Sequence, residues 1–204
     1  MLNREQQAIT KDIAMKKCMD MYKALFLFLT GGAGTGKTFT TKVIFQMLMR
    51  LYDSHHSTDP LKPKGLILSY TGKATYNASG TTVHSALLMP FNNSSPTPLS
   101  SETLDALIKL YEELRLVFID KVSVNGSRFL SCIDDQLRNL KHVQTKYFEN
   151  VDIIFYGHLY QAQAIQDSLI FELSILNKRP IPYDFWQENV KCYELHITMS
   201  QIDK

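Results

Sequence analysis

Eight consecutive residues near the N-terminus have the types and spacing that bind the phosphates of a nucleotide. They are Gly31, Gly32, Ala33, Gly34, Thr35, Gly36, Lys37 and Thr38, in the pattern G-x-x-x-x-G-K-[ST]. The glycines allow successive backbone N–H groups to point at one anion. Lys37 would place a positive charge on the β- and γ-phosphates, and the Thr38 hydroxyl would bind magnesium. The run is therefore predicted to bind a nucleoside triphosphate.

The segments on either side of this run fit a phosphate-binding loop. The apolar residues 25–29 precede it and are typical of a buried strand, and residues 38–52 follow with the apolar spacing of a helix. The alternative is a glycine-rich turn that joins a strand to a helix and binds nothing. The register of Gly31, Gly36 and Lys37 in this strand–helix context favours the phosphate site.

Length and composition are those of an ordinary globular protein. The chain has 204 residues, a mass of 23.4 kDa, a net charge of +2 and a sequence pI of about 8.3. This charge permits contact with nucleic acid without requiring it. Three cysteines far apart favour a reducing compartment and offer no zinc-binding spacing. Because the N-terminus lacks the apolar segment of a signal peptide and no apolar run could cross a bilayer, we expect an intracellular chain without membrane association.

Apolar strands alternate with helical segments along the chain. Strands are expected at 25–30, 66–68, 116–119 and 151–155. Helices are expected at 3–22, 38–52, 101–113 and 126–141. This alternation is typical of a parallel sheet with helices on both faces. The predicted fold class is therefore α/β, with the phosphate-binding loop after the first strand.

Polar residues stand at the ends of these strands, where a parallel α/β sheet binds its ligands. Asp120 closes the apolar run 116–119, and Gly157 to Gln161 follow the strand at 151–155. An aspartate in the position of Asp120 holds magnesium in other phosphate-loop proteins. The alternative for Asp120 is a helix cap or a turn former. The phosphate-binding pattern upstream favours the magnesium ligand.

In this order the segments resemble the petite-integration-frequency family of DNA helicases (Pif helicases), and in particular the Helitron-transposon type. The resemblance is carried by residues 2–6, 71–74, 82–85, 116–120 and 157–161, which are similar to successive helicase motifs. It implies the N-terminal RecA-like motor domain of an ATP-dependent 5′-to-3′ DNA helicase, with ATP and Mg²⁺ as cofactors. It also implies single-stranded DNA as partner and no other small-molecule substrate.

The same resemblance implies roles for individual residues. Gln6 would read the adenine base, and Gln161 would sense the γ-phosphate. Thr71, Lys73 and His84 would contact single-stranded DNA. For Lys73 and His84 the alternative is a solvated lysine and a histidine whose polar groups are satisfied within the protein. The family works in recombination, repair, telomere maintenance or transposition, which implies a nuclear location, or a mitochondrial one as in related helicases.

Three residues depart from the family pattern at catalytic positions. Lys121 stands where the family has the glutamate that activates water, His158 stands where it has an aspartate, and Ser200 stands where it has an arginine. An ammonium group cannot act as the general base, a role worth roughly 10²–10⁴ in rate. An arginine finger is worth about 10³–10⁵. We therefore expect a chain that binds ATP and hydrolyses it poorly, as a result either of drift in a decaying copy or of selection for binding alone.

The resemblance places one motor domain at residues 1–190 and the truncated start of a second at 191–204. Two other functions remain open. A small phosphotransferase would need an arginine-rich lid late in the chain, but Arg179 is the only arginine after Arg138. A non-enzymatic DNA- or partner-binding remnant of a transposon helicase would keep the fold without turnover.

Overall fold

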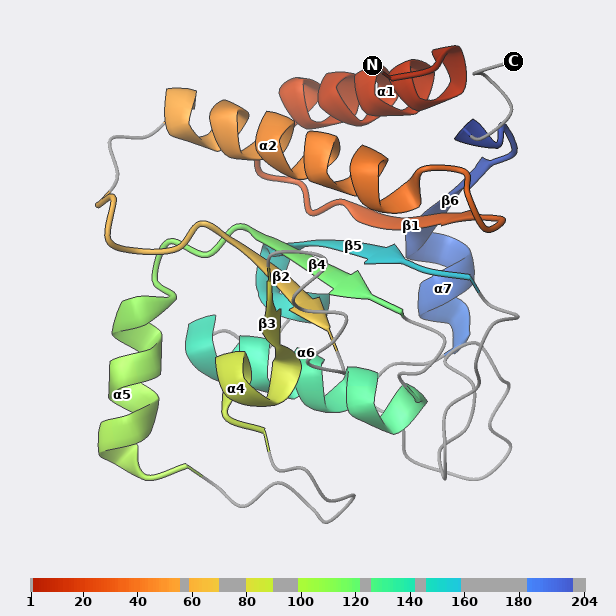
Figure 1. The fold of residues 1–204 in the computed structure, drawn as a ribbon. Helices are drawn as coiled ribbons and strands as arrows, with labels where there is room; N and C mark the ends of the chain where they lie inside the picture. The colour runs from red at the N-terminus through yellow and green to blue at the C-terminus, as the bar shows by residue number, and fades with distance from the viewer. Residues whose placement is uncertain are drawn as a thin grey trace.

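A six-stranded parallel sheet forms the centre of the computed structural model, which describes residues 2–55, 59–69, 80–89, 99–121, 126–141, 146–158 and 183–199. The strand order is β3-β2-β4-β5-β1-β6, and every neighbouring pair is parallel (Figure 1). The strands are β1 (Phe26–Gly31), β2 (Gly65–Ser69), β3 (Thr81–Thr82), β4 (Leu116–Asp120), β5 (Asp152–Tyr156) and β6 (Val190–Leu195). The α/β class predicted from the sequence is confirmed.

Helices cover both faces of this sheet. They are α1 (Arg4–Met19), α2 (Lys37–His55), α4 (Val83–Leu87), α5 (Ser101–Leu110), α6 (Ser127–Lys141) and α7 (Tyr183–Asn189), with a short 3-10 turn η2 (Tyr147–Asn150). Figure 1 shows α1 and α2 together on one side of the sheet, and α4 and α6 on the other. The predicted arrangement of helices on both faces is therefore confirmed.

The alternation of side chains along the strands explains this layering. In β4, Leu116 and Phe118 pack with α1 and α2, whereas Val117 and Ile119 pack with the helices of the opposite face. All four side chains are fully buried. A strand covered on both faces reads as a continuous apolar run, which is why the sequence pattern located it within one residue.

Strand β6 was not predicted from the sequence, and it spans the expected domain boundary between residues 190 and 191. It pairs with β1 along its whole length, from Phe26 opposite Val190 to Gly31 opposite Leu195. Residues 191–195, which we expected to begin a second motor domain, therefore belong to the same sheet as the phosphate-binding loop.

A buried ion pair joins the two helices of one face to the amino-terminal edge of the sheet. Lys17 of α1 and Asp152 of β5 are 3% and 1% exposed, and Lys17 Nζ lies 2.9 Å from Asp152 Oδ1. The Tyr52 hydroxyl of α2 donates to the other carboxylate oxygen, and the Leu25 N–H donates to Oδ1 at 2.9 Å. Burial raises the pKa of Asp152, and these three donors oppose the rise.

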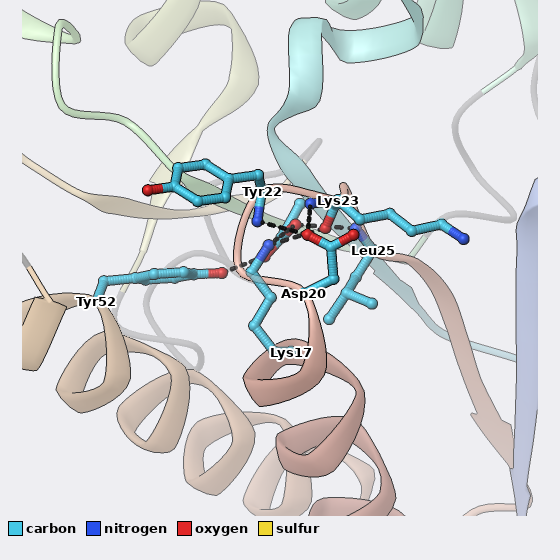
Figure 2. Close-up of polar contacts among 7 residues, drawn as sticks. Lys17, Asp20, Tyr22, Lys23, Leu25 and Tyr52 are labelled. Carbon is cyan, nitrogen blue, oxygen red and sulfur yellow. Dashed lines mark hydrogen bonds and ion pairs between the residues drawn. The ribbon is translucent and has the colours of Figure 1, made fainter.

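The turn between α1 and β1 completes this cluster, as Figure 2 shows. Asp20 accepts the backbone N–H groups of Tyr22 and Lys23, each at 3.0 Å. The Lys23 carbonyl in turn accepts a hydrogen bond from Lys17 Nζ at 3.0 Å. The Lys17 ammonium thus joins α1 to the Lys23 carbonyl before β1 and to Asp152 of β5, so it sets how α1 sits against these two strands.

We predict that Lys17→Met costs about 3–5 kcal/mol of unfolding free energy, because it leaves the buried Asp152 carboxylate without its counter-charge. Lys16→Met is the matched control. Its partner Asp12 is 42% exposed, so the loss there should be at most about 1 kcal/mol. Urea unfolding followed by circular dichroism measures both. Equal losses in the two variants would show that the buried pair does not hold the fold together.

Candidate functional site

The phosphate-binding pattern forms the connection between β1 and α2. Strand β1 ends at Gly31, and α2 begins at Lys37. Gly34 and Gly36 have φ angles of +78° and +76°, in the left-handed region that favours glycine. A Cβ on Gly36 would also lie 2.7 Å from Gln6 Nε2 and 3.1 Å from Met199 Cγ. The loop therefore needs glycine there for its backbone angle and for its packing.

Donors from three parts of the chain hold the carbonyl groups of this loop. Lys37 Nζ donates to the carbonyls of Gly31 and Gly32 at 2.8 and 2.7 Å. Gln6 Nε2 donates to the Thr35 carbonyl at 3.1 Å, and Met199 N–H donates to the Gly34 carbonyl at 2.9 Å. Within the described ranges, the backbone N–H groups of residues 32–36 donate no hydrogen bond of normal geometry to another group. The carbonyls of Gly32, Gly34 and Thr35 are thus occupied, while the N–H groups of the loop are available for an anion.

Gln6 lies under the loop and is fully buried. Its amide oxygen accepts the Asn3 N–H at 3.0 Å, and Asn3 Oδ1 accepts the Gln6 N–H at 2.8 Å, which makes a capping box at the start of α1. The side chain that the resemblance assigns to the adenine base is thus engaged with the loop backbone. A contact with a base would require Gln6 to exchange these hydrogen bonds.

Asp120 lies in a row of polar side chains across the carboxyl ends of three strands. Ser69 of β2 and Tyr156 of β5 are paired with it in register. Burial raises the pKa of Asp120, while the backbone and the charge of Lys121 act in the opposite direction. Ser69 Oγ is buried and has no hydrogen-bond partner among the residues that the structure describes. Burial and the Asp120 charge also raise the pKa of Tyr156.

Ser69 and Tyr156 were not among the site residues named from the sequence. Each ends an apolar strand opposite Asp120. Residues that lie in register on neighbouring strands point to the same face of the sheet, so the three side chains share a face. That signal was present in the sequence, but it needed the strand order before the three positions could be placed side by side. Thr41 of α2 adds another buried hydroxyl without a partner in the described part of the chain.

Two of the three positions that depart from the family pattern lie at this edge. Lys121 directly follows β4, has a left-handed φ of +53° and is exposed. His158 follows Gly157, whose N–H donates to the Leu29 carbonyl of β1 at 3.2 Å. The structure therefore brings Lys121 and His158 to the edge of the sheet that carries the loop, Thr38 and Asp120. Ser200 and Gln161 lie outside the described residues.

Of the three positions assigned to DNA contact, only His84 lies within the described residues. Thr71 and Lys73 lie outside the described ranges. His84 of α4 is 6% exposed, its ring centroid lies 5.3 Å from that of Phe129, and burial lowers its pKa. His84 therefore packs within the fold, and its contact with DNA stays a prediction. No helix in the described part of the chain has the length and apolar character to cross a membrane.

Comparison with known proteins gives a consistent result. The model of the PIF1-like helicase family matches residues 1–204. The ATP-dependent DNA helicase PIF1 of Candida albicans is 23% identical over 205 residues, which is 93% of this chain and 20% of that protein.

Solved structures of Pif1 helicases share the fold. A Bacteroides sp Pif1 in complex with ADP-AlF4 has a TM-score of 0.71 at 23% identity, over 98% of this chain and 43% of that one. A Bacteroides Pif1 in complex with ADP-AlF3 and single-stranded DNA has a TM-score of 0.69 at 22% identity, over 100% of this chain and 44% of that one. The Candida albicans Pif1 helicase gives 0.69 at 21% identity, over 100% and 42%.

This chain therefore spans about a fifth of the curated relative and less than half of the solved chains. The six-stranded sheet and the loop after β1 lie within the region that they share. Because the family model matches from the first residue to the last, the chain belongs to the PIF1-like helicase family.

Proposed function

We propose that this chain is the nucleotide-binding motor domain of an ATP-dependent 5′-to-3′ DNA helicase. The observation that carries the proposal is the loop between β1 and α2, whose carbonyl groups are held from outside while its N–H groups are available. This arrangement suits a polyphosphate, since N–H groups at a helix N-terminus bind anions. Membership of a helicase family leaves the phosphotransferase alternative without support.

The residues present fit ATP with magnesium. Lys37 would leave the carbonyls of Gly31 and Gly32 and move to the β- and γ-phosphates, where its charge balances theirs. A hydroxyl and a carboxylate are the oxygen ligands that Mg²⁺ prefers, and Thr38 and Asp120 supply them at one edge of the sheet. Bound magnesium would neutralise phosphate charge. Gln6 would support the loop in the state described and turn to the adenine only when nucleotide binds.

We propose that hydrolysis by this chain is poor or absent. Lys121 follows Asp120 directly, so its ammonium would approach the triphosphate and stabilise it while offering no base. Ser200 cannot provide the cationic stabilisation of an arginine. His158, beside the β5 end, would add a smaller defect. An ATP-binding remnant without turnover is the second candidate function, and Lys121 is the residue that favours it.

Single-stranded DNA is the proposed partner. A solved relative carries single-stranded DNA, and we extend this partner to the present chain through the shared fold. Thr71 and Lys73 are the proposed contacts, with Gln161 as sensor of the γ-phosphate. We also propose the Helitron type, a nuclear location, roles in DNA recombination, repair or transposition, and a second motor domain that begins after Leu195 in the whole protein.

Lys37→Ala should abolish ATP binding in a calorimetric titration, because it removes the charge that faces the β- and γ-phosphates. The parent should bind ATP–magnesium in the micromolar-to-millimolar range, about −8 to −4 kcal/mol. Arg50→Ala removes a positive charge from the exposed far end of α2 and should leave the affinity unchanged. If Lys37→Ala bound ATP as tightly as the parent, the loop would not be the site.

Phosphate release by the chain should stay near background and should not rise on addition of single-stranded DNA. The reasons are Lys121 and Ser200, together with the need of a motor for two lobes that close on each other. A phosphate-release assay with and without oligonucleotide measures this. Robust DNA-stimulated release would mean that another group supplies the base.

Lys121→Glu combined with Ser200→Arg should restore measurable hydrolysis when the chain is joined to the second motor domain of a relative. Either change alone should restore little, because base and cation act on one transition state. His158→Asp should add a smaller gain. A double variant that binds ATP and DNA but turns over no faster than its parent would place the defect elsewhere.

A further inference from the structure

The first turn of α1 is hydrogen-bonded to the residues that follow β6. The Glu5 carboxylate accepts the His196 N–H at 3.1 and 3.0 Å through its two oxygens. One of these oxygens also accepts the Ile197 N–H at 3.2 Å. Residues 196–198 belong to no helix or strand, so a charged acceptor holds the backbone where the sheet no longer does. Hydrogen bonds to a charged group are about twice as strong as neutral ones.

The same segment contacts the phosphate-binding loop. Met199 N–H donates to the Gly34 carbonyl at 2.9 Å, and the Met199 side chain packs close to Gly36. Asn3 Nδ2 approaches Met199 Sδ at 3.6 Å. The start of α1, the segment 196–199 and the loop therefore meet at one junction, in which the residue after Glu5 also bonds the loop.

A second set of contacts holds α1 against β6 and so fixes the position of Glu5. Asp12 of α1 lies 2.9 Å from Lys191 Nζ of β6 and also bonds Lys16 and Tyr193. These partners hold the pKa of Asp12 well below its usual value, and burial and Asp12 raise the pKa of Tyr193 to about 12. Because α1 and β6 are joined here, Glu5 can act as a fixed support for the segment 196–199.

We propose that Glu5 is a positioning residue for the phosphate-binding loop. By holding the N–H groups of His196 and Ile197, it sets Met199 against Gly34 and Gly36 and keeps the loop in the shape that receives phosphates. This inference rests on the proposed binding of ATP to the loop. Coupling between two sites is reciprocal. Bound nucleotide therefore also stabilises the hydrogen bonds of the segment 196–199, which follows the last strand of the sheet.

Glu5 also lies in the first turn of α1, where a negative charge stabilises any helix. A purely structural role would therefore change the stability of α1 and leave the loop unaffected. Two readouts separate the roles: hydrogen exchange of the amides of residues 196–199, and the affinity for ATP–magnesium. Glu5→Gln serves as the conservative variant, because its carbonyl oxygen can still accept these N–H groups but carries no charge.

The experiment compares the parent chain with Glu5→Ala, Glu5→Gln and the control Glu188→Ala, which removes an exposed carboxylate of α7. Glu5→Ala should speed exchange at His196 and Ile197 and weaken ATP–magnesium binding at least about fivefold. Glu5→Gln should lie between parent and alanine variant. Glu188→Ala should match the parent in both measurements, and ATP should slow exchange at residues 196–199 in the parent.

Three results would overturn the proposal. Unchanged exchange in Glu5→Ala would show that the carboxylate does not hold the segment. Faster exchange with unchanged ATP affinity would show that the segment does not position the loop. A parent chain that binds no ATP would overturn the proposed function and the coupling together. The exchange rates would still report whether Glu5 holds the segment 196–199. If the alanine variant does not fold, the same comparisons are made with Glu5→Gln.

Discussion

The shape of the loop between β1 and α2 depends on which groups donate hydrogen bonds to its carbonyls. A loop that binds phosphate must turn its N–H groups toward the anion, so its carbonyls have to be satisfied from other directions. Here the donors are the Lys37 ammonium, the Gln6 amide and the Met199 N–H, which come from three different parts of the chain. The shape of the site is therefore a property of the whole fold and not of eight residues alone.

The rest of the structure keeps these donors in place. Strand β1 lies between β5 and β6, which fixes the start of the loop. Helix α1, which supplies Gln6, is held at its end by the buried Lys17–Asp152 pair and along its length by the contacts of Asp12 with Lys191 and Tyr193 of β6. A buried pair of this kind is costly to break when only one partner is removed. The ion pair at the amino edge of the sheet thus supports a site at its carboxyl edge.

The parts that sequence reasoning predicted are those with strong local patterns. The buried strands appear as apolar runs, and the phosphate-binding loop appears as a fixed spacing of glycines and a lysine. Strand β6 was missed because its sequence mixes charged and apolar residues, with half of its residues exposed at the edge of the sheet. Thr81–Thr82 was missed as a strand because two residues are too short for any periodic pattern.

The contacts around the loop were beyond local reasoning for a different reason. Glu5 and His196 meet across almost the full length of the chain, and no sequence pattern links them. Gln6 was assigned to a base by resemblance, yet the structure shows it bound to the loop backbone. His84 was assigned to DNA, yet it is packed against Phe129. In each case the observed contact depends on tertiary packing, which a motif does not contain.

A structure of the chain with a non-hydrolysable ATP analogue and magnesium would test the central claim most directly. The account predicts that the phosphates lie against the N–H groups of residues 32–38 and that Lys37 Nζ has moved from the carbonyls of Gly31 and Gly32 to the phosphates. It also predicts that the Gly34 carbonyl keeps its bond to the Met199 N–H, while the Gln6 amide leaves the Thr35 carbonyl and turns to the adenine. Phosphates bound elsewhere, or a Lys37 that remains on the two carbonyls, would contradict it.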